Sequence, residues 1–238
     1  MSDIPRAERL IAALDVPDAG QARALVEKLG DSVRFYKIGL ELSSTEGYYE
    51  LLAWLAARGN KVFADLKLYD IPETVRRAVG NLRSRGATFL TVHGHRSVMA
   101  AAAGEKGTMK ILAVTVLTSF DQRDIDEMRG STGGSLSVGE LVLARARGAA
   151  ETGCDGVIAS GLEAAKLKAE FGKRLLIVTP GIRPAEARPA DDQKRTVDVA
   201  QAFANGADYI VVGRPIRDAA DPRAAALAIQ ATIAKSFP

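Results

Sequence analysis

The sequence predicts a closed (β/α)8 barrel that forms a single domain over residues 1–238. Eight short apolar segments have the length of strands and are bounded by Gly, Pro, Asp or Asn. Ala-rich stretches with helical spacing lie between them, and no change of composition marks a linker. An open, doubly wound sheet has the same local pattern, but eight strand–helix units favour closure into a TIM barrel.

The predicted strands are rich in Val, Ile and Leu, as expected for parallel strands that are buried on both faces. They cover residues 10–16, 33–40, 62–68, 89–94, 110–117, 156–160, 175–182 and 209–214. The clearest helical stretches between them are 19–29, 48–58 and 140–152. Several of these end at a glycine, which is a common helix stop.

Two connections are longer than the others, residues 118–135 and 183–196. In a barrel both follow the carboxyl end of a strand, where the active sites of such barrels lie. The GSTGGS sequence in the first indicates flexibility, and the charged RPADDQKR sequence in the second is typical of a mobile lid. A plain surface insertion is the alternative for each.

Composition narrows the class of protein. The chain is 47% apolar and 26% charged, a globular profile, and its net charge is +3 with basic residues scattered among acids. This distribution argues against a nucleic-acid surface and favours a small anionic substrate. Cys154 is the one cysteine, so no disulfide can form within the chain, which suits a reducing cytoplasm. The sequence has no signal-peptide pattern and no apolar run near the roughly 18 residues of a membrane span, so we expect a cytoplasmic protein without a membrane partner.

The segment FADLKLYDIPETV, residues 63–75, carries the most chemical information. Asp65 and Lys67 are two positions apart on a predicted strand and therefore point to the same face. Burying a carboxylate and an ammonium group inside a barrel costs free energy unless the two are paired or take part in function. A structural ion pair is one alternative, and Asp70 has an alternative as a helix N-cap, with Glu73 at capping-box spacing. The three charges together favour a catalytic site.

These residues form the motif D-x-K-x-x-D-I-P-x-T, which resembles the signature of orotidine 5′-phosphate decarboxylases. A sister group of sugar-phosphate decarboxylases shares the core of this motif. The rest of the chain favours the first group, because further family motifs follow in the family's order over essentially the whole sequence. They are Leu14-Asp15, Lys37, TVLTS at 115–119, TPGIRP at 179–184 and VVGRPI at 211–216.

The resemblance implies a role for each matching position. Lys67 is expected to stabilise a carbanion at C6 of the orotate ring and to protonate it, with Asp65 and Asp70 as the other catalytic residues. The expected substrate contacts are Asp15 and Lys37 for the ribose, Thr118 or its neighbour Ser119 for the pyrimidine, and Arg183, Gln193, Gly213 and Arg214 for the phosphate. Asp70 and Thr74 are expected to reach across a homodimer interface and complete the partner's site.

No metal or organic cofactor is expected. The sequence has neither a P-loop nor a dinucleotide-binding glycine motif, and His93 and His95 are not accompanied by other metal-ligand patterns. The family pattern is not followed everywhere, since Tyr69 stands where many members have His and Glu73 where many have Asn. The alternatives are a metal-dependent keto-sugar phosphate decarboxylase, with an acid in place of Lys37, an aldolase or epimerase barrel, and a non-catalytic phosphate-binding barrel.

Overall fold

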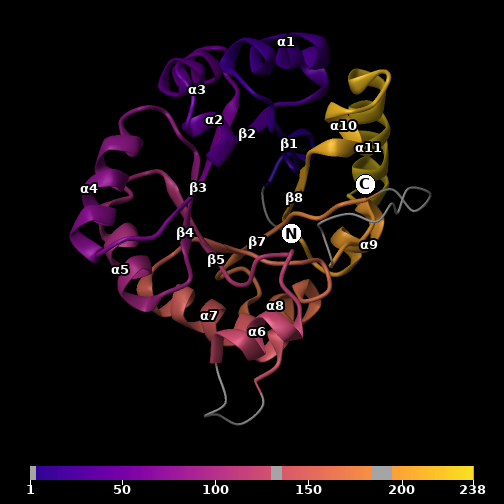
Figure 1. Cartoon of the computed structure of the whole chain (residues 1–238). Helices are drawn as coiled ribbons and strands as arrows, with labels where there is room; N and C mark the ends of the chain where they lie inside the picture. The colour runs from indigo at the N-terminus through magenta and orange to yellow at the C-terminus, as the bar shows by residue number, and fades with distance from the viewer. Residues whose placement is uncertain (1–3, 130–135, 184–194, 238) are drawn as a thin grey trace.

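The computed structural model describes residues 4–129, 136–183 and 195–237 and confirms the predicted (β/α)8 barrel. Eight parallel strands are hydrogen-bonded in the order of the sequence, and β8 pairs with β1 to close the barrel. Figure 1 shows the strands at the centre and the helices around them, with α10 and α11 beside β8. Because the strands are parallel, all their carboxyl ends meet at one face.

The strands are shorter than most of the predicted segments. They are β1 Leu10–Ala13, β2 Phe35–Gly39, β3 Lys61–Leu68, β4 Phe89–His93, β5 Lys110–Val114, β6 Gly156–Ile158, β7 Leu176–Thr179 and β8 Tyr209–Val212. Most predicted segments extend a few residues beyond the carboxyl end of the observed strand, and these extra residues lie outside the observed strands. That departure places the polar side chain of Asp15 at the mouth of the barrel.

The helices surround the barrel in chain order. They are η1 Arg6–Glu8, α1 Ala19–Leu29, η2 Gly30–Ser32, α2 Leu40–Ser43, α3 Tyr48–Ala57, α4 Pro72–Arg83, α5 Arg96–Glu105, α6 Gln122–Arg129, α7 Val138–Thr152, α8 Ala164–Phe171, α9 Val199–Ala204, α10 Arg214–Arg217 and α11 Pro222–Ser236. The long connection after β5 contains α6, which was not expected. This helix forms because the Asp121 carboxylate accepts the amide of Arg123 at its start and Ile125 is buried. In the described parts of the chain no helix is long and apolar enough to cross a membrane.

The barrel interior is closed below its mouth by aromatic rings. Phe35 lies 4.9 Å from Phe89 between ring centroids, and Tyr209 lies 5.2 Å from Phe89 in an edge-on arrangement. Phe63 completes this buried group, and a separate and larger apolar core lies between the strands and the helices. Above this aromatic plug, at the carboxyl ends of the strands, the barrel is open.

Candidate active site

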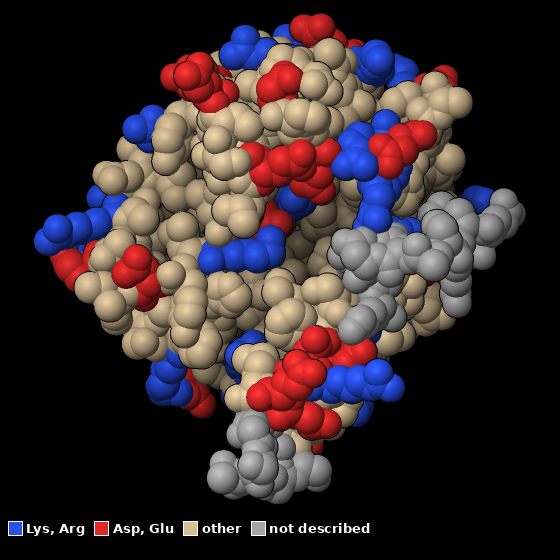
Figure 2. All heavy atoms as spheres, viewed as in Figure 1, with Lys and Arg blue, Asp and Glu red and all other residues tan. Residues whose placement is uncertain are grey.

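A cavity of about 270 Å³ opens at the carboxyl ends of the strands, above the aromatic plug. Figure 2 shows this face hollowed at its centre, with acidic and basic side chains gathered around the hollow. Eight of the residues that the sequence singled out line the cavity together: Asp15, Lys37, Asp65, Lys67, Thr118, Arg183, Gly213 and Arg214. Segments that lie far apart in the sequence therefore build one polar site over an apolar floor.

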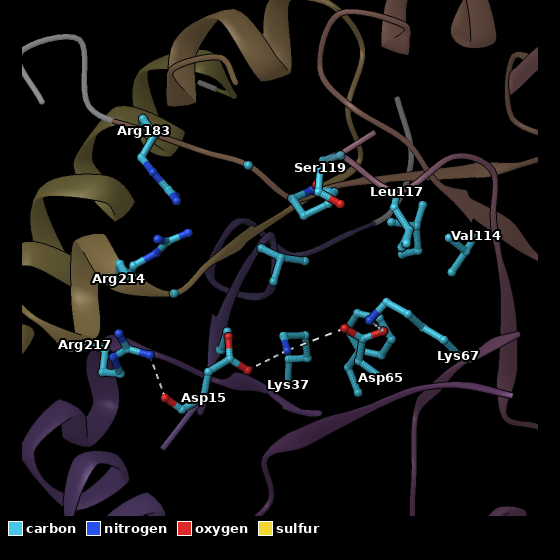
Figure 3. Close-up of a pocket in the computed structure, with 18 of the residues that line it drawn as sticks. Asp15, Lys37, Asp65, Lys67, Val114, Leu117, Ser119, Arg183, Arg214 and Arg217 are labelled. Carbon is cyan, nitrogen blue, oxygen red and sulfur yellow. Dashed lines mark hydrogen bonds and ion pairs between the residues drawn. The ribbon is translucent and has the colours of Figure 1, made fainter. Parts of the chain in front are cut away.

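Four charged side chains form a continuous row of alternating sign, shown in Figure 3. The Nζ of Lys37 lies 2.8 Å from Oδ1 of Asp15 and 3.5 Å from Oδ2 of Asp65. The other oxygen of Asp65 lies 2.9 Å from the Nζ of Lys67. Each inner charge of this row has an opposite charge on both sides, which compensates the cost of burying it.

The two inner members, Lys37 and Asp65, are buried. Burial by itself would raise the pKa of Asp65, but Lys37 and Lys67 outweigh it and lower this pKa below its usual 3.8. Burial would lower the pKa of Lys37, but the carboxylates of Asp65 and Asp15 outweigh it and raise this pKa above 10.5. Both groups therefore stay charged at neutral pH.

The backbone at Lys67 is strained. Its φ angle is 48°, the one positive value among the non-glycine residues that the structure describes. The cause is an irregularity between β3 and β4, where Ala64 lies opposite Leu90 but Leu68 lies opposite Val92. This irregularity turns the Lys67 ammonium towards Asp65 in the cavity.

Thr91, which was not predicted from the sequence, holds this irregular segment. Its hydroxyl donates to Oδ1 of Asp65 at 2.8 Å and accepts the amide of Lys67 at 3.0 Å. Thr91 is fully buried in β4. A polar residue within the apolar strand sequence FLTVH was the signal that could have revealed it.

The opposite side of the cavity is basic. Arg183 follows β7, and Arg214 begins α10 directly after Gly213. Figure 3 shows the guanidinium groups of Arg183 and Arg214 pointing towards one another on the side away from Lys67. Two like charges that approach each other in a cavity suit an anion placed between them.

Arg217, one turn further along α10, also lines the cavity and was not singled out from the sequence. Thr118 is buried and Ser119 lies beside it in the wall, so both remain candidates for a contact with a ring. Gln193 lies outside the described residues.

Asp70 and Thr74 do not line the cavity of the single chain, and both are exposed. The N-cap interpretation of Asp70 is wrong. The N-cap of α4 is Ile71, with no side-chain cap, and the Asp70 carboxylate accepts the adjacent amide of Ile71 at 2.6 Å. The capping box is absent because Glu73 instead binds Arg76 and Arg77.

The two histidines lie in a second cavity of about 430 Å³, behind the wall formed by Val114 and Leu117. The Tyr69 ring lies 5.1 Å from His93 and 4.8 Å from His95, so the three rings form one cluster. His93 is half-buried and His95 is exposed. In the described parts of the chain no three His, Cys, Asp or Glu residues are placed to hold a metal ion.

A buried arginine supports the wall of the main cavity. Arg195 donates through Nη2 to the carbonyl oxygens of Val116 and Leu117, at 3.2 and 3.0 Å, and pairs with Glu163 at 2.6 Å. It thereby fixes the connection that carries Thr118. No sequence pattern indicates this role, because Arg195 ends a charged segment that is typical of a surface.

Comparisons with known proteins agree with one another. The family model described as "Orotidine 5'-phosphate decarboxylase / HUMPS family" matches residues 8–229. A protein from Methylococcus capsulatus, named orotidine 5′-phosphate decarboxylase, is 58% identical over 234 residues, which cover 98% of this chain and 95% of that protein. A protein of the same name from Rhodopseudomonas palustris is 52% identical over 231 residues, 96% of each chain. The crystal structure of orotidine 5′-phosphate decarboxylase from Lactobacillus acidophilus superposes with a TM-score of 0.81 at 38% identity, covering 95% of this chain and 99% of that one.

Proposed function

The chain belongs to the orotidine 5′-phosphate decarboxylase / HUMPS family, and we propose that it removes CO2 from orotidine 5′-phosphate to leave UMP, the last step of de novo pyrimidine biosynthesis in the cytoplasm. The observation that carries this proposal is the row Asp15–Lys37–Asp65–Lys67, which faces a basic region in the same cavity. Lys37 favours this reaction over the metal-dependent sugar-phosphate branch, whose members have an acid at that position.

The chemical difficulty is a carbanion at C6 of the ring, which no ring position delocalises well. A fixed ammonium group placed at the developing charge stabilises it without any reorganisation during the reaction. Lys67 supplies that group, and its Nζ is held 2.9 Å from Asp65. As the C6–CO2 bond breaks, its electron pair stays on C6, and Lys67 then donates a proton to form UMP. The neutral amine regains its proton from solvent.

Asp65 contributes through repulsion. In the proposed complex its carboxylate lies close to the substrate carboxylate, and two like charges ~4 Å apart repel by about 4 kcal/mol at an effective dielectric near 20. This repulsion disappears as CO2 leaves, which lowers the barrier relative to the bound substrate. Thr91 and Lys37 hold Asp65 in place so that it cannot turn away.

The remaining cavity residues bind the parts of the substrate that do not react. We assign the phosphate to Arg183, Arg214, the Gly213 amide and Gln193, and the ribose to Asp15 and Lys37. Thr118, with Ser119 as the alternative, contacts the pyrimidine ring. Binding energy from the phosphate side then holds the reacting carbon against Lys67.

We also propose a homodimer in which each chain completes the other's site. Asp70 and Thr74 are exposed and lie outside their own cavity, beside exposed apolar side chains of Tyr69 and Ile71, which are 61% and 68% accessible. A second copy that covers these side chains would bring Asp70 to the partner's Lys67. The proposed reaction uses no metal ion and no organic cofactor.

The decisive experiment follows the absorbance of orotidine 5′-phosphate after addition of the purified protein. We expect rapid loss of absorbance with the wild type, no detectable loss with Lys67→Ala, and full activity with Lys110→Ala, an exposed lysine at the amino end of β5. Exhaustive chelation should leave the rate unchanged. A wild-type protein without decarboxylase activity would overturn the proposal, and a rate abolished by chelation would favour the sugar-phosphate branch.

A complementation experiment tests the shared site. Lys67→Ala and Asp70→Ala proteins are each expected to be inactive, whereas their mixture should regain activity after subunit exchange. Each heterodimer then contains one site with both Lys67 and Asp70. A mixture that stays inactive although heterodimers have formed would contradict the shared-site arrangement.

A further inference from the structure

Arg217 connects two parts of the site that are remote in the sequence. It is the last residue of α10, the short helix that begins at Arg214. Its Nη1 donates to the main-chain oxygen of Asp15 at 2.6 Å, a contact across 202 positions of the chain that Figure 3 marks with a dashed line. The loop after β1 is thereby attached to the turn after β8.

The guanidinium of Arg217 is itself held in one orientation. Asp218 accepts from its Nε at 2.6 Å and from its Nη2 at 2.9 Å, a two-point contact that fixes the plane of the group. The backbone of α10 is also held by hydrogen bonds, because the amides of Ile216 and Arg217 both donate to the main-chain oxygen of Gly213 at 2.9 Å. Arg217 therefore presents a rigid donor to Asp15.

Asp15 needs such a support. The strand β1 ends at Ala13, and the Leu14 amide still donates to the oxygen of Lys37 at 2.9 Å. Asp15 lies one residue beyond this ladder, with a side chain that is 39% exposed. Its carboxylate nevertheless begins the charged row and lies 2.8 Å from the Lys37 ammonium.

We infer that Arg217 is a positioning residue for the reaction, because it holds the main chain of Asp15 so that the Asp15 carboxylate stays on Lys37. Lys37 then keeps Asp65 beside Lys67. This inference rests on the proposed function, but it assigns Arg217 no contact with the substrate. A direct contact with the phosphate is the competing role, since Arg217 also lines the cavity.

Two substrates separate these roles. Orotidine lacks the phosphate group and still carries the carboxylate that is lost. A residue that acts through Asp15 affects both compounds, whereas a phosphate ligand affects only orotidine 5′-phosphate. We expect Arg217→Ala to lower kcat/KM by about 10- to 100-fold with both, the range for loss of one charge-assisted hydrogen bond. With orotidine 5′-phosphate the loss should lie mainly in kcat. Arg217→Lys, which keeps the charge but cannot make the two-point contact, should fall between Arg217→Ala and the wild type.

Arg223→Ala is the matched control. Arg223 also holds a main-chain oxygen, that of Leu29 at 3.2 Å, and a carboxylate, that of Asp31, but it lies outside the cavity on α11. We expect this control to change the unfolding midpoint about as much as Arg217→Ala does, with no change in kcat. A purely structural role for Arg217 would give the two variants the same kinetics.

A double-mutant cycle with Asp15→Ala completes the test. If Arg217 acts through the Asp15 carboxylate, Arg217→Ala should cost little once that carboxylate is absent. Full additivity of the two losses, a loss confined to orotidine 5′-phosphate, or wild-type kinetics of Arg217→Ala would each overturn the inference. A wild-type chain that decarboxylates neither compound would instead overturn the proposed function, so the two failures are distinguishable.

Discussion

The strained backbone of Lys67 predicts an unusual order of stability for two variants at this position. Lys67→Ala and Lys67→Gly both remove the ammonium group and its contact with Asp65. They differ in the Cβ atom, which Ala keeps at a φ of 48° and Gly lacks. The difference in stability between the two variants therefore isolates the backbone conformation from the charge.

The magnitude follows from two opposing effects. A side chain in the left-handed region costs roughly 1–2 kcal/mol relative to glycine. Glycine also increases the conformational entropy of the unfolded chain, which costs about 0.4–1 kcal/mol. Lys67→Gly should therefore be more stable than Lys67→Ala by about 0.5–1 kcal/mol, or about 1–4 °C in unfolding midpoint for a domain of this size.

The assay is urea unfolding of both variants at the same protein concentration, with the m-value compared to verify that the unfolded states are alike. Asn81 provides the control, because it is exposed within α4, where the backbone is regular. There Asn81→Gly should be less stable than Asn81→Ala by about 1 kcal/mol, the opposite order. Equal stabilities, or a more stable Lys67→Ala at unchanged m-value, would refute the idea that the backbone at Lys67 is strained.

Three other features give further predictions. Arg195→Met should lower the free energy of unfolding by about 3 kcal/mol, because the Glu163 carboxylate, whose side chain is 13% exposed, then loses its cationic partner. In urea unfolding, the double variant with Glu163→Leu should recover most of the loss, and no recovery would contradict the pairing. Burial, together with neighbouring positive charges, lowers the pKa of His93 below 6.5. As the pH falls, His93 therefore takes up a proton in the unfolded chain before it does so in the folded protein. Its contribution to the free energy of unfolding is complete above about pH 6.5 and is lost as the pH falls below that value. His93→Gln should reduce this dependence of stability on pH in unfolding curves measured between roughly pH 7 and pH 5. Burial also raises the pKa of Cys154 to about 11, so a thiol reagent at neutral pH should label it only as fast as the protein unfolds; immediate labelling of the native protein would show that the thiol is accessible.

Much of the fold could be predicted because it depends on local patterns. The spacing of apolar residues and the glycine stops indicate strands and helices without knowledge of their neighbours, and the helix at 19–29 was predicted with its observed bounds, Ala19–Leu29. The count of eight units then favours a closed barrel. In the connection that contains α6, the sequence pattern was insufficient. The eight residues Gln122–Arg129 are too short and too polar for apolar spacing alone to indicate a helix.

The residues of the candidate site also differ in how far they could be predicted from local sequence. Asp65 and Lys67 are evident from the sequence because charges are expensive inside an apolar strand. Thr91, Arg195 and Arg217 are not evident, because their partners lie 26, 79 and 202 positions away in the chain. A hydroxyl or a guanidinium has no local pattern that distinguishes a support of the site from an ordinary polar residue.

The sequence by itself determined the architecture and the identity of most charged residues at the barrel mouth, although not of Arg217. The tertiary structure alone decided how these charges are paired, that Lys67 lies in a left-handed backbone conformation, and that Asp70 and Thr74 lie outside their own cavity. The physical reason is that secondary structure depends on neighbours a few residues apart. Electrostatic pairing and backbone strain depend on which strands and turns closure of the barrel brings within a few ångströms of each other.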